Sequence, residues 1–218
     1  MEKLGEVEKL IRPILDKYEK LGLQPTPICI ELKNNLQNQS WVDSVQAVLD
    51  KVKKARSIFH ISTEITKDKN DQRVEEMFAE FDVAKRLANT KFFGDFSEVE
   101  YLPSSNDSRS PDFLAKNGST ITPVEVKLLS PHSLDEKKFF QKLIDKINNQ
   151  ALSQLQSYHQ AQKFEVGIIF VWSHQPIALQ NISYHDLKIY FGRSVQKQKF
   201  NVTIVCILSN LGLWDFYL

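Results

Sequence analysis

The sequence has few of the residues that mark a phosphate-binding loop, a zinc site or an exported protein. Its seven glycines do not cluster, so it has no glycine-rich phosphate loop. The two cysteines lie far apart, which argues against a cysteine zinc site and favours a reducing, cytoplasmic compartment. The five histidines show no zinc-binding spacing, and no Gly-x-Ser-x-Gly motif supports an α/β-hydrolase.

A strong net charge and long apolar runs are also lacking. The formal net charge is +1, so binding to a polyanion would depend on local clusters of Lys and Arg. Such clusters occur at 51–56, 137–146 and 188–199, and each is either a solvated face or a contact for phosphates. Apolar runs such as 166–172 are too short to span a bilayer, and the charged N-terminus lacks a secretory signal. We therefore expect a soluble protein with no membrane partner.

Helical spacing of apolar residues dominates the first third of the chain. It predicts helices at 2–21 and 40–60. Pro13 should kink or divide the first helix, and Ser40 is a suitable N-cap for the second. Residues 23–32 hold two prolines and predict a connector or a short extended piece.

The rest of the chain alternates between helical and strand-like patterns. An amphipathic helix is predicted at 71–89 and a longer helical region at 135–162. Strands are predicted at 99–102, 111–115, 121–129, 166–172 and 202–208, with a final edge strand at 213–218. Asn117-Gly118, between two of these strands, is typical of a tight hairpin.

This order of elements predicts an α/β fold with a central mixed β-sheet flanked by helices. Residues 67–218 would form that domain, and residues 1–66 would form an N-terminal helical region. A chain of 218 residues is long enough for one sizeable domain with an elaborated end.

An acidic residue two positions before a lysine occurs five times, at Glu31, Glu125, Asp135, Glu136 and Asp186. Asp135 and Glu136 begin a helical run, and Asp186 lies in a polar segment that is predicted to be a turn. Glu31 has no acidic residue on a preceding strand. Glu125 alone lies on a predicted strand that follows a hairpin.

The strand that carries Glu125 has the chemistry of a metal centre. Alternation along a strand places Glu125 and Lys127 on one face, and the hairpin brings Asp112 alongside them. Charges on a core strand are costly unless they are paired or bound to an ion. The carboxylates of Asp112 and Glu125, with the carbonyl of Val126, are oxygen ligands that suit Mg²⁺ or Mn²⁺.

Such an ion would lower the pKa of a bound water and offset the charge that grows on a phosphate. Lys127 would then orient the attacking water or stabilise that charge. The alternative interpretation is that Asp112 is only a turn residue. Glu125 and Lys127 would then form a cross-strand ion pair on a solvated face of the sheet.

Pro111-Asp112, followed by Glu125-Val126-Lys127 after a hairpin, resembles the PD-(D/E)xK nuclease superfamily. The resemblance implies a restriction-endonuclease-like core of helix, three strands, helix and strand. Members commonly carry a helical Glu-x-x-x-Ala-x-x-Leu motif, and residues 80–87 fit it. The resemblance therefore makes Glu80 a further metal or water ligand, with Glu76 as the fallback. A solvated glutamate is the simpler alternative for Glu80.

A RecB-like branch of the superfamily has Gln-x-x-x-Tyr on the helix after the lysine. Gln154 and Tyr158 fit that spacing, and Gln150, one turn earlier, is an alternative to Gln154. The resemblance thus adds Gln154 to the catalytic set. A polar helix face with a partly buried tyrosine would produce the same pattern.

The resemblance implies a Mg²⁺-dependent phosphodiesterase that acts on nucleic acid, and specifically a DNA endonuclease. Cutting both strands of a duplex needs two sites, which a homodimer would supply. An RNA nuclease is an alternative, as is a non-catalytic nucleic-acid-binding or assembly module that keeps the fold.

Overall fold

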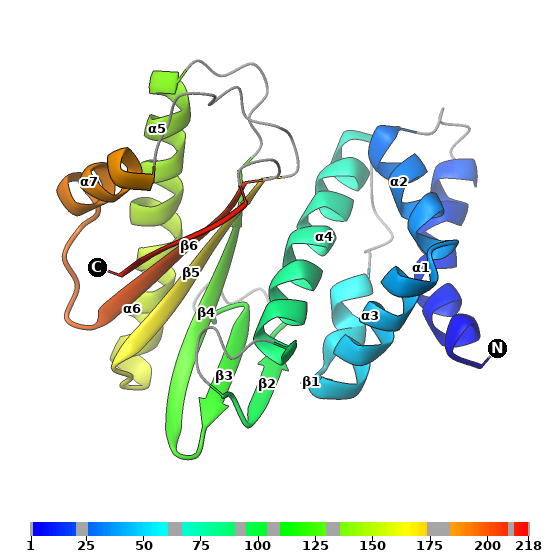
Figure 1. Ribbon diagram of the computed structural model, residues 1–218, viewed down its shortest axis with the longest axis horizontal. Coiled ribbons are helices and arrows are strands. Elements are labelled where there is room, and N and C mark those ends of the chain that lie inside the picture. The colour runs from blue at the N-terminus through cyan, green and yellow to red at the C-terminus, as the bar shows by residue number, and fades with distance from the viewer. Residues whose placement is uncertain are drawn as a thin grey trace. The chain divides into compact units, whose positions relative to one another are not determined.

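Helices predominate before residue 90, and the longest strands lie from residue 120 onward (Figure 1). The packing of the chain divides it into two units, residues 1–103 and 104–218. The computed structural model describes residues 2–20, 26–60, 67–89, 95–103, 110–129, 136–173, 184–208 and 212–217. The predicted element ends at 21, 135 and 218 lie outside these residues, as do residues 23–25.

The described part of the first unit holds four α-helices, a 3-10 helix and two short strands. In chain order they are α1 (Glu2–Lys20), α2 (Pro27–Leu36), α3 (Gln39–Lys51), β1 (Val52–Lys53), η1 (Ala55–Phe59), α4 (Lys67–Asn89) and β2 (Glu98–Tyr101). Strands β1 and β2 pair in parallel. The N-terminal helices are therefore confirmed, and α1 runs through Pro13 as one element.

The prediction of a connector or extended piece at 23–32 was wrong for its described part. Helix α2 occupies Pro27–Leu36, because Thr26 and Pro27 provide a helix start. Thr26 is the N-cap, and its side chain accepts a hydrogen bond from the Cys29 backbone N–H at 3.3 Å. Pro27 takes the first helical position, where its missing N–H has no partner to lose.

The helix predicted at 40–60 is shorter than expected and begins earlier. Its N-cap is Asn38 rather than Ser40, and the Asn38 side chain accepts from the Trp41 N–H at 3.3 Å. The chain leaves the helix at Val52 and turns at Lys54, which has a φ of 59°. Such a left-handed backbone cannot continue an α-helix, so β1 and η1 replace its last turns.

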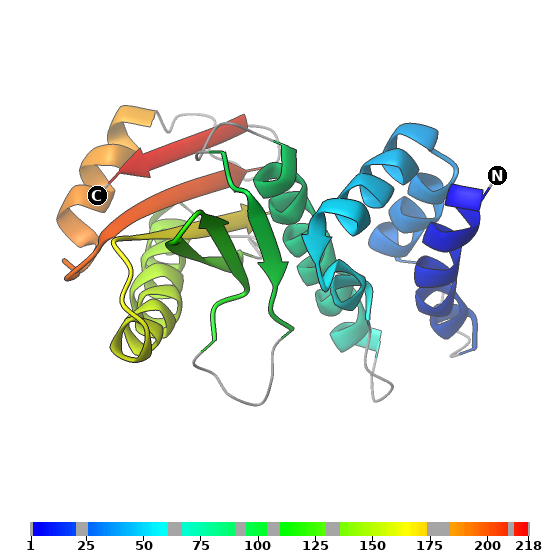
Figure 2. The ribbon, with the colours of Figure 1, turned by 90° about the horizontal axis from the view of Figure 1, so that it is seen from below.

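The second unit is built on a mixed sheet whose strand order is β3-β4-β5-β6-β7. The strands are β3 (Phe113–Asn117), β4 (Thr120–Leu128), β5 (Val166–Ser173), β6 (Asn201–Leu208) and β7 (Gly212–Tyr217). Strands β4, β5 and β6 are parallel, whereas β3 and β7 are antiparallel to their neighbours. Figure 2 shows these strands fanning out with the twist of the sheet.

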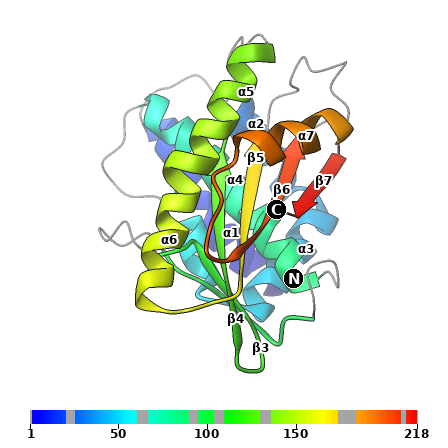
Figure 3. The ribbon, with the colours of Figure 1, turned by 90° about the vertical axis from the view of Figure 1, so that its left-hand side faces the viewer.

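One face of this sheet is covered by helices that connect the parallel strands. Helices α5 (Glu136–Asp145) and α6 (Leu152–Ala161) form one rod with the π-helical segment η2 (Lys146–Ala151) between them (Figure 3). Helix α7 (Tyr184–Ser194) joins β5 to β6. Buried side chains of these helices form one apolar core with those of the sheet, including Phe139, Leu143, Phe191, Ile169 and Ile204.

The α/β class, the mixed sheet and most of its strands were thus predicted correctly. Helix α7 was missed, and Asp186 lies in its first turn rather than in a polar turn. Among the described residues, every helix is either too short or too polar to cross a lipid bilayer.

The hairpin predicted at Asn117-Gly118 is confirmed. Asn117 pairs with Thr120, so only Gly118 and Ser119 form the loop. Gly118 has a φ of +59°, a backbone conformation that glycine adopts without steric cost. Glycine at the first position of a two-residue loop is typical of a type II′ turn, which suits the strand twist. This tight loop sets the register of β3 against β4.

Candidate metal centre

Asp112 and Glu125 face each other across the open end of the β3–β4 hairpin. The last paired residues are Phe113 and Val124, so one further step of the register places Asp112 opposite Glu125. Residues that lie opposite each other in an antiparallel pair project from the same face of the sheet. The tight hairpin therefore brings together two acidic residues that are 13 positions apart in the sequence.

Glu125 and Lys127 form an ion pair under the helical layer. Their partners on β5 are Ile169 and Val171, which belong to the core beneath α5, α6 and α7. The Lys127 Nζ lies 2.7 Å from Glu125 Oε2, and the two side chains are 13% and 0% exposed. The parity predicted from the sequence is therefore confirmed, and the pair lies on the helix-covered face.

The alternative of a cross-strand ion pair on a solvated face does not describe this arrangement. Both residues belong to β4, and the Glu125 side chain has no exposure to solvent. Burying an ionised carboxylate is costly even with a partner, because the pair loses more hydration than one contact restores. Glu125 is therefore not one of the solvated surface charges that keep a protein soluble, and its costly burial points to a functional role.

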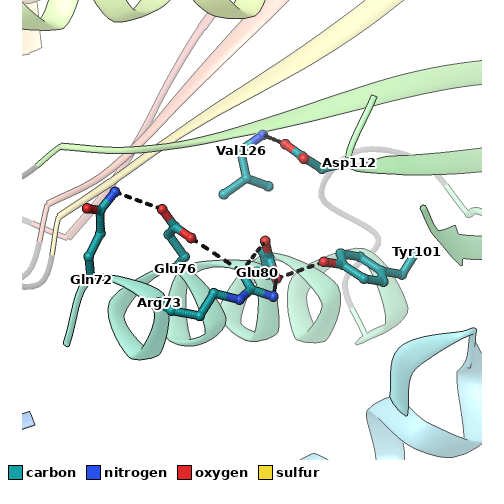
Figure 4. Close-up of polar contacts among 7 residues, drawn as sticks. All are labelled: Gln72, Arg73, Glu76, Glu80, Tyr101, Asp112 and Val126. Atoms are coloured by element: carbon teal, nitrogen blue, oxygen red, sulfur yellow. Dashed lines mark hydrogen bonds and ion pairs between the residues drawn. The ribbon is translucent and has the colours of Figure 1, made fainter. Parts of the chain in front are cut away.

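Asp112 is held by the backbone of the opposite strand. Its Oδ2 accepts a hydrogen bond from the Val126 N–H at 2.6 Å (Figure 4). The Leu129 N–H donates to the Trp172 carbonyl, so odd-numbered residues of β4 bond to β5 and even-numbered ones face β3. The Val126 peptide groups thus point to the place where β3 has already ended, and Asp112 takes over one of them.

Pro111 explains why the described part of β3 offers no donor to the Val126 carbonyl. Extension of the register by two residues places Pro111 opposite Val126. Proline has no N–H, so it cannot donate to the Val126 carbonyl. The Pro-Asp pair therefore ends the strand pairing where the sequence predicts a backbone oxygen ligand.

The electrostatics of Glu125 are those of a carboxyl group with too little compensation. Burial and the neighbouring Asp112 carboxyl raise the pKa of Glu125 well above its usual range, and Lys127 opposes them. Glu125 Oε1 is buried and has no hydrogen-bond partner in the described part of the chain. Lys127 thus holds one oxygen of the Glu125 carboxyl, and within the described residues the other oxygen has no donor.

These residues fit a small divalent cation. A hard cation would satisfy the buried Glu125 Oε1 and remove the repulsion between the two carboxylates. Within the described residues, no three or more His, Cys, Asp or Glu side chains gather into a metal-binding group. The ion would therefore be held by Asp112, Glu125 and backbone oxygen, with water in its other positions, as is usual for Mg²⁺.

Glu80 lies in the first unit, on α4, in a hydrogen-bonded cluster of its own. Arg73 donates to its two carboxylate oxygens at 3.1 and 3.3 Å, and the Tyr101 hydroxyl donates at 3.0 Å (Figure 4). Glu76 also accepts from Arg73, at 3.4 Å. Glu80 is thus not a solvated glutamate, and its role as a metal ligand stays a prediction.

The partners of Glu80 were missed in the sequence. Arg73 precedes Glu80 by seven residues, two turns of one helix, which is a usable signal. Burial alone would lower the pKa of Arg73, but the Glu80 carboxylate outweighs it and the pKa is raised. Tyr101 comes from β2 and had no sequence signal, because its approach to α4 depends on the folded chain.

Gln154 and Tyr158 lie on α6, toward the hairpin end of β4. Lys116 acts electrostatically on Tyr158, and Lys116 pairs with Ile121. Ile121 precedes Glu125 by four residues, or about 13 Å along the strand. Gln154 is half-buried and lies one helical turn before Tyr158, on the side of Glu125. Gln150 is exposed on η2. A catalytic role for Gln154 stays a prediction.

Comparison with known proteins gives no match. No protein-family model matches the chain, and neither a curated protein nor a solved structure is similar to it.

Proposed function

We propose that this protein is a metal-dependent phosphodiesterase that cuts nucleic acid, and specifically a DNA endonuclease with a restriction-endonuclease-like core. The observation that carries the proposal is the buried Glu125 carboxylate. It lies opposite Asp112 and pairs with Lys127 at 2.7 Å through one oxygen, while no group among the described residues donates a hydrogen bond to the other. Burying the Glu125 carboxyl opposite the half-buried Asp112 carboxyl is costly, and cation binding next to a phosphate accounts for it.

Asp112 and Glu125 would hold Mg²⁺ or Mn²⁺, together with the Val126 carbonyl. The bound ion would supply an acidified water and neutralise charge on the phosphate. Lys127 would donate a hydrogen bond to the reacting phosphate or to the attacking water, and Glu125 keeps its ammonium group in place. Glu80 and Gln154 are the proposed assisting residues, as in the superfamily that the sequence resembles.

Cleavage of supercoiled plasmid DNA tests the proposal. With Mg²⁺ or Mn²⁺ the purified protein should convert the plasmid to nicked and linear forms, and EDTA should stop the reaction. Lys127→Ala should abolish cleavage, because the group that stabilises phosphate charge is lost. Lys116→Ala removes a lysine from the neighbouring strand β3 and should leave cleavage intact.

Undiminished cleavage by Lys127→Ala would contradict the assignment. Lack of cleavage by the unaltered protein on both DNA and matched RNA would favour a non-catalytic nucleic-acid-binding or assembly module. Cleavage of the RNA alone would reassign the substrate but keep the site. Linear product from a single binding event is the result expected of a homodimer, because two sites would then act together.

A further inference from the structure

Three lysines on α5 and the start of η2 form a row along one side of the helical rod. They are Lys138, Lys142 and Lys146, hereafter the lysine row. Residues four positions apart on a helix are neighbours on its surface. Lys138 and Lys142 are exposed, and Lys146 is half-buried. The row therefore approaches the sheet as the chain runs from α5 into η2.

The direction of the lysine row follows from the residues on either side of it. Each lysine is followed by a buried residue that packs into the core: Phe139, Leu143 and Ile147. Phe140, one position further round the helix, contacts Tyr190 of α7 with 4.5 Å between ring centroids. Successive residues are about 100° apart around the axis. The lysine row thus lies on the side of the rod that is turned away from α7.

The strand on that side is β4. Helix α7 connects β5 to β6, whereas the rod α5–η2–α6 connects β4 to β5. Segment η2 packs against β4, and Lys146 is its first residue. In Figure 3 the rod and α7 lie side by side over the strands, with the rod nearer to β4. The lysine row therefore borders the strand that carries Glu125 and Lys127.

Charge is distributed unevenly between the two units. Residues 104–218 contain 12 Lys and Arg against 9 Asp and Glu, a formal net charge of +3. Residues 1–103 contain 16 against 18, a net charge of −2. Among the side chains that the structure describes, the exposed acidic group nearest to the lysine row in sequence is Asp145, which accepts a hydrogen bond from Gln141 at 3.1 Å. The net charge of the unit that holds the candidate metal centre therefore favours a polyanion, and that of the other unit does not.

We propose that the lysine row binds the phosphate backbone of the nucleic acid and guides it to Asp112, Glu125 and Lys127. This inference rests on the proposed function, and it names the surface that the substrate uses. Lysine ammonium groups contact phosphates as mobile point charges, which suits binding that does not depend on base sequence. A row that ends beside β4 would place one phosphodiester at the candidate metal centre.

The salt dependence of DNA binding tests this contact without any cleavage. The probe is a fluorescently labelled DNA duplex, titrated in EDTA between about 50 and 200 mM NaCl. Each phosphate contact contributes about 0.9 to the slope of log K against log salt, so loss of three removes about 2.7. The variant Lys138→Ala/Lys142→Ala/Lys146→Ala should show that loss and bind more weakly.

A matched variant controls for net charge. Lys163, Lys197 and Lys199 are exposed and precede β5 and β6, at the end of the parallel strands opposite to Lys127. Lys163→Ala/Lys197→Ala/Lys199→Ala removes the same charge from the same unit and should leave the slope almost unchanged. Lys197 and Lys199 belong to the basic cluster at 188–199, and we thus assign them to a solvated face rather than to a phosphate contact. Should the lysine-row variant fail to fold by circular dichroism, Lys142→Ala alone, at an exposed position, should lower the slope by about 0.9.

An unchanged slope in the lysine-row variant, or an equal loss in both triple variants, overturns the inference. The proposed catalytic function is tested separately, by the cleavage activity of Lys127→Ala. If Lys127→Ala cleaves as well as the unaltered protein while the lysine-row variant still loses slope, the binding surface stands and the catalytic assignment falls. If the lysine-row variant keeps its slope while Lys127→Ala is inactive, the reverse holds.

Discussion

The carboxylate of Asp112 accepts a 2.6 Å hydrogen bond from the Val126 N–H, one step beyond the last paired residues of β3 and β4. The side chain thereby stands in for a backbone acceptor at the point where the strands stop pairing. This anchor orients Asp112 opposite Glu125 and gives it two separable roles. One is structural, through Val126, and the other is the proposed binding of a cation.

Two substitutions at Asp112 should separate these roles. Asp112→Asn keeps a carbonyl oxygen for the Val126 N–H, so the free energy of unfolding should change by no more than about 1 kcal/mol. Asp112→Ala removes the acceptor, and we expect a loss of about 1–3 kcal/mol in urea denaturation without added metal. Both variants should lose the rise in Tm that Mn²⁺ gives the unaltered protein. A Mn²⁺ response that survives in Asp112→Asn would remove Asp112 from the ligand set.

The raised pKa of Glu125 predicts a pH-dependent stability in the absence of metal. The folded state holds this proton more tightly than the unfolded state does. The stabilisation is therefore complete below the unfolded pKa, which is about 4.3 for Glu, and is lost as pH rises through the folded pKa. Glu125→Gln cannot ionise, so its Tm should fall less over the same rise in pH. Parallel pH profiles for the two proteins would contradict this origin of the effect.

The hairpin offers a test of backbone geometry. Gly118→Ala places a side chain at a φ of +59°, which should cost about 1–2 kcal/mol of unfolding free energy although nothing lies within 4 Å. Gly192→Ala is the matched control, because Gly192 lies in α7 and also has nothing within 4 Å of an added Cβ. There the change should stabilise by about 0.5–1 kcal/mol. Effects of the same sign at both positions would contradict the assigned turn.

The cluster around Glu80 should contribute to the stability of the first unit. Arg73→Met leaves a carboxylate that is 13% exposed without its ion-pair partner, and we expect a loss of about 1–3 kcal/mol. Tyr101→Phe removes one hydrogen bond to that carboxylate and should cost about 1–2 kcal/mol. Arg12→Met breaks an exposed pair with Glu8 and should cost less than about 0.5 kcal/mol. If Arg73→Met and Arg12→Met lowered the free energy of unfolding in urea by the same amount, burial would add nothing to the contribution of the Arg73–Glu80 ion pair.

The features of the fold that could be predicted are those that depend on residues close together in the sequence. Period-two alternation placed Glu125 and Lys127 on one face, and Asn117-Gly118 marked the hairpin, because both depend on neighbours in the sequence. The two prolines at 25 and 27 led to the wrong prediction of a connector at 23–32, because proline is as common at a helix start as in a connector. Helix α7 was missed because Gly192 and the exposed Ile189 weaken its amphipathic pattern.

The electrostatic state of the candidate metal centre could not be predicted in the same way. Sequence parity gives the face on which Glu125 lies, but its complete burial depends on the helical rod, of which η2 and α6 contact β4. The π-helical turn has no sequence signal, and the same is true of the loss of a ladder partner at Val126. The role of Pro111 became clear only with the register, because it depends on which residue lies opposite Val126.

A crystal structure of the protein soaked in Mn²⁺, with anomalous diffraction recorded, tests the central claim most directly. We expect one anomalous peak at about 2.1–2.2 Å from a carboxylate oxygen of Asp112 and from Glu125 Oε1, with waters completing the coordination. An absence of metal density at saturating Mn²⁺, with Asp112 and Glu125 still facing each other beside Lys127, would contradict it.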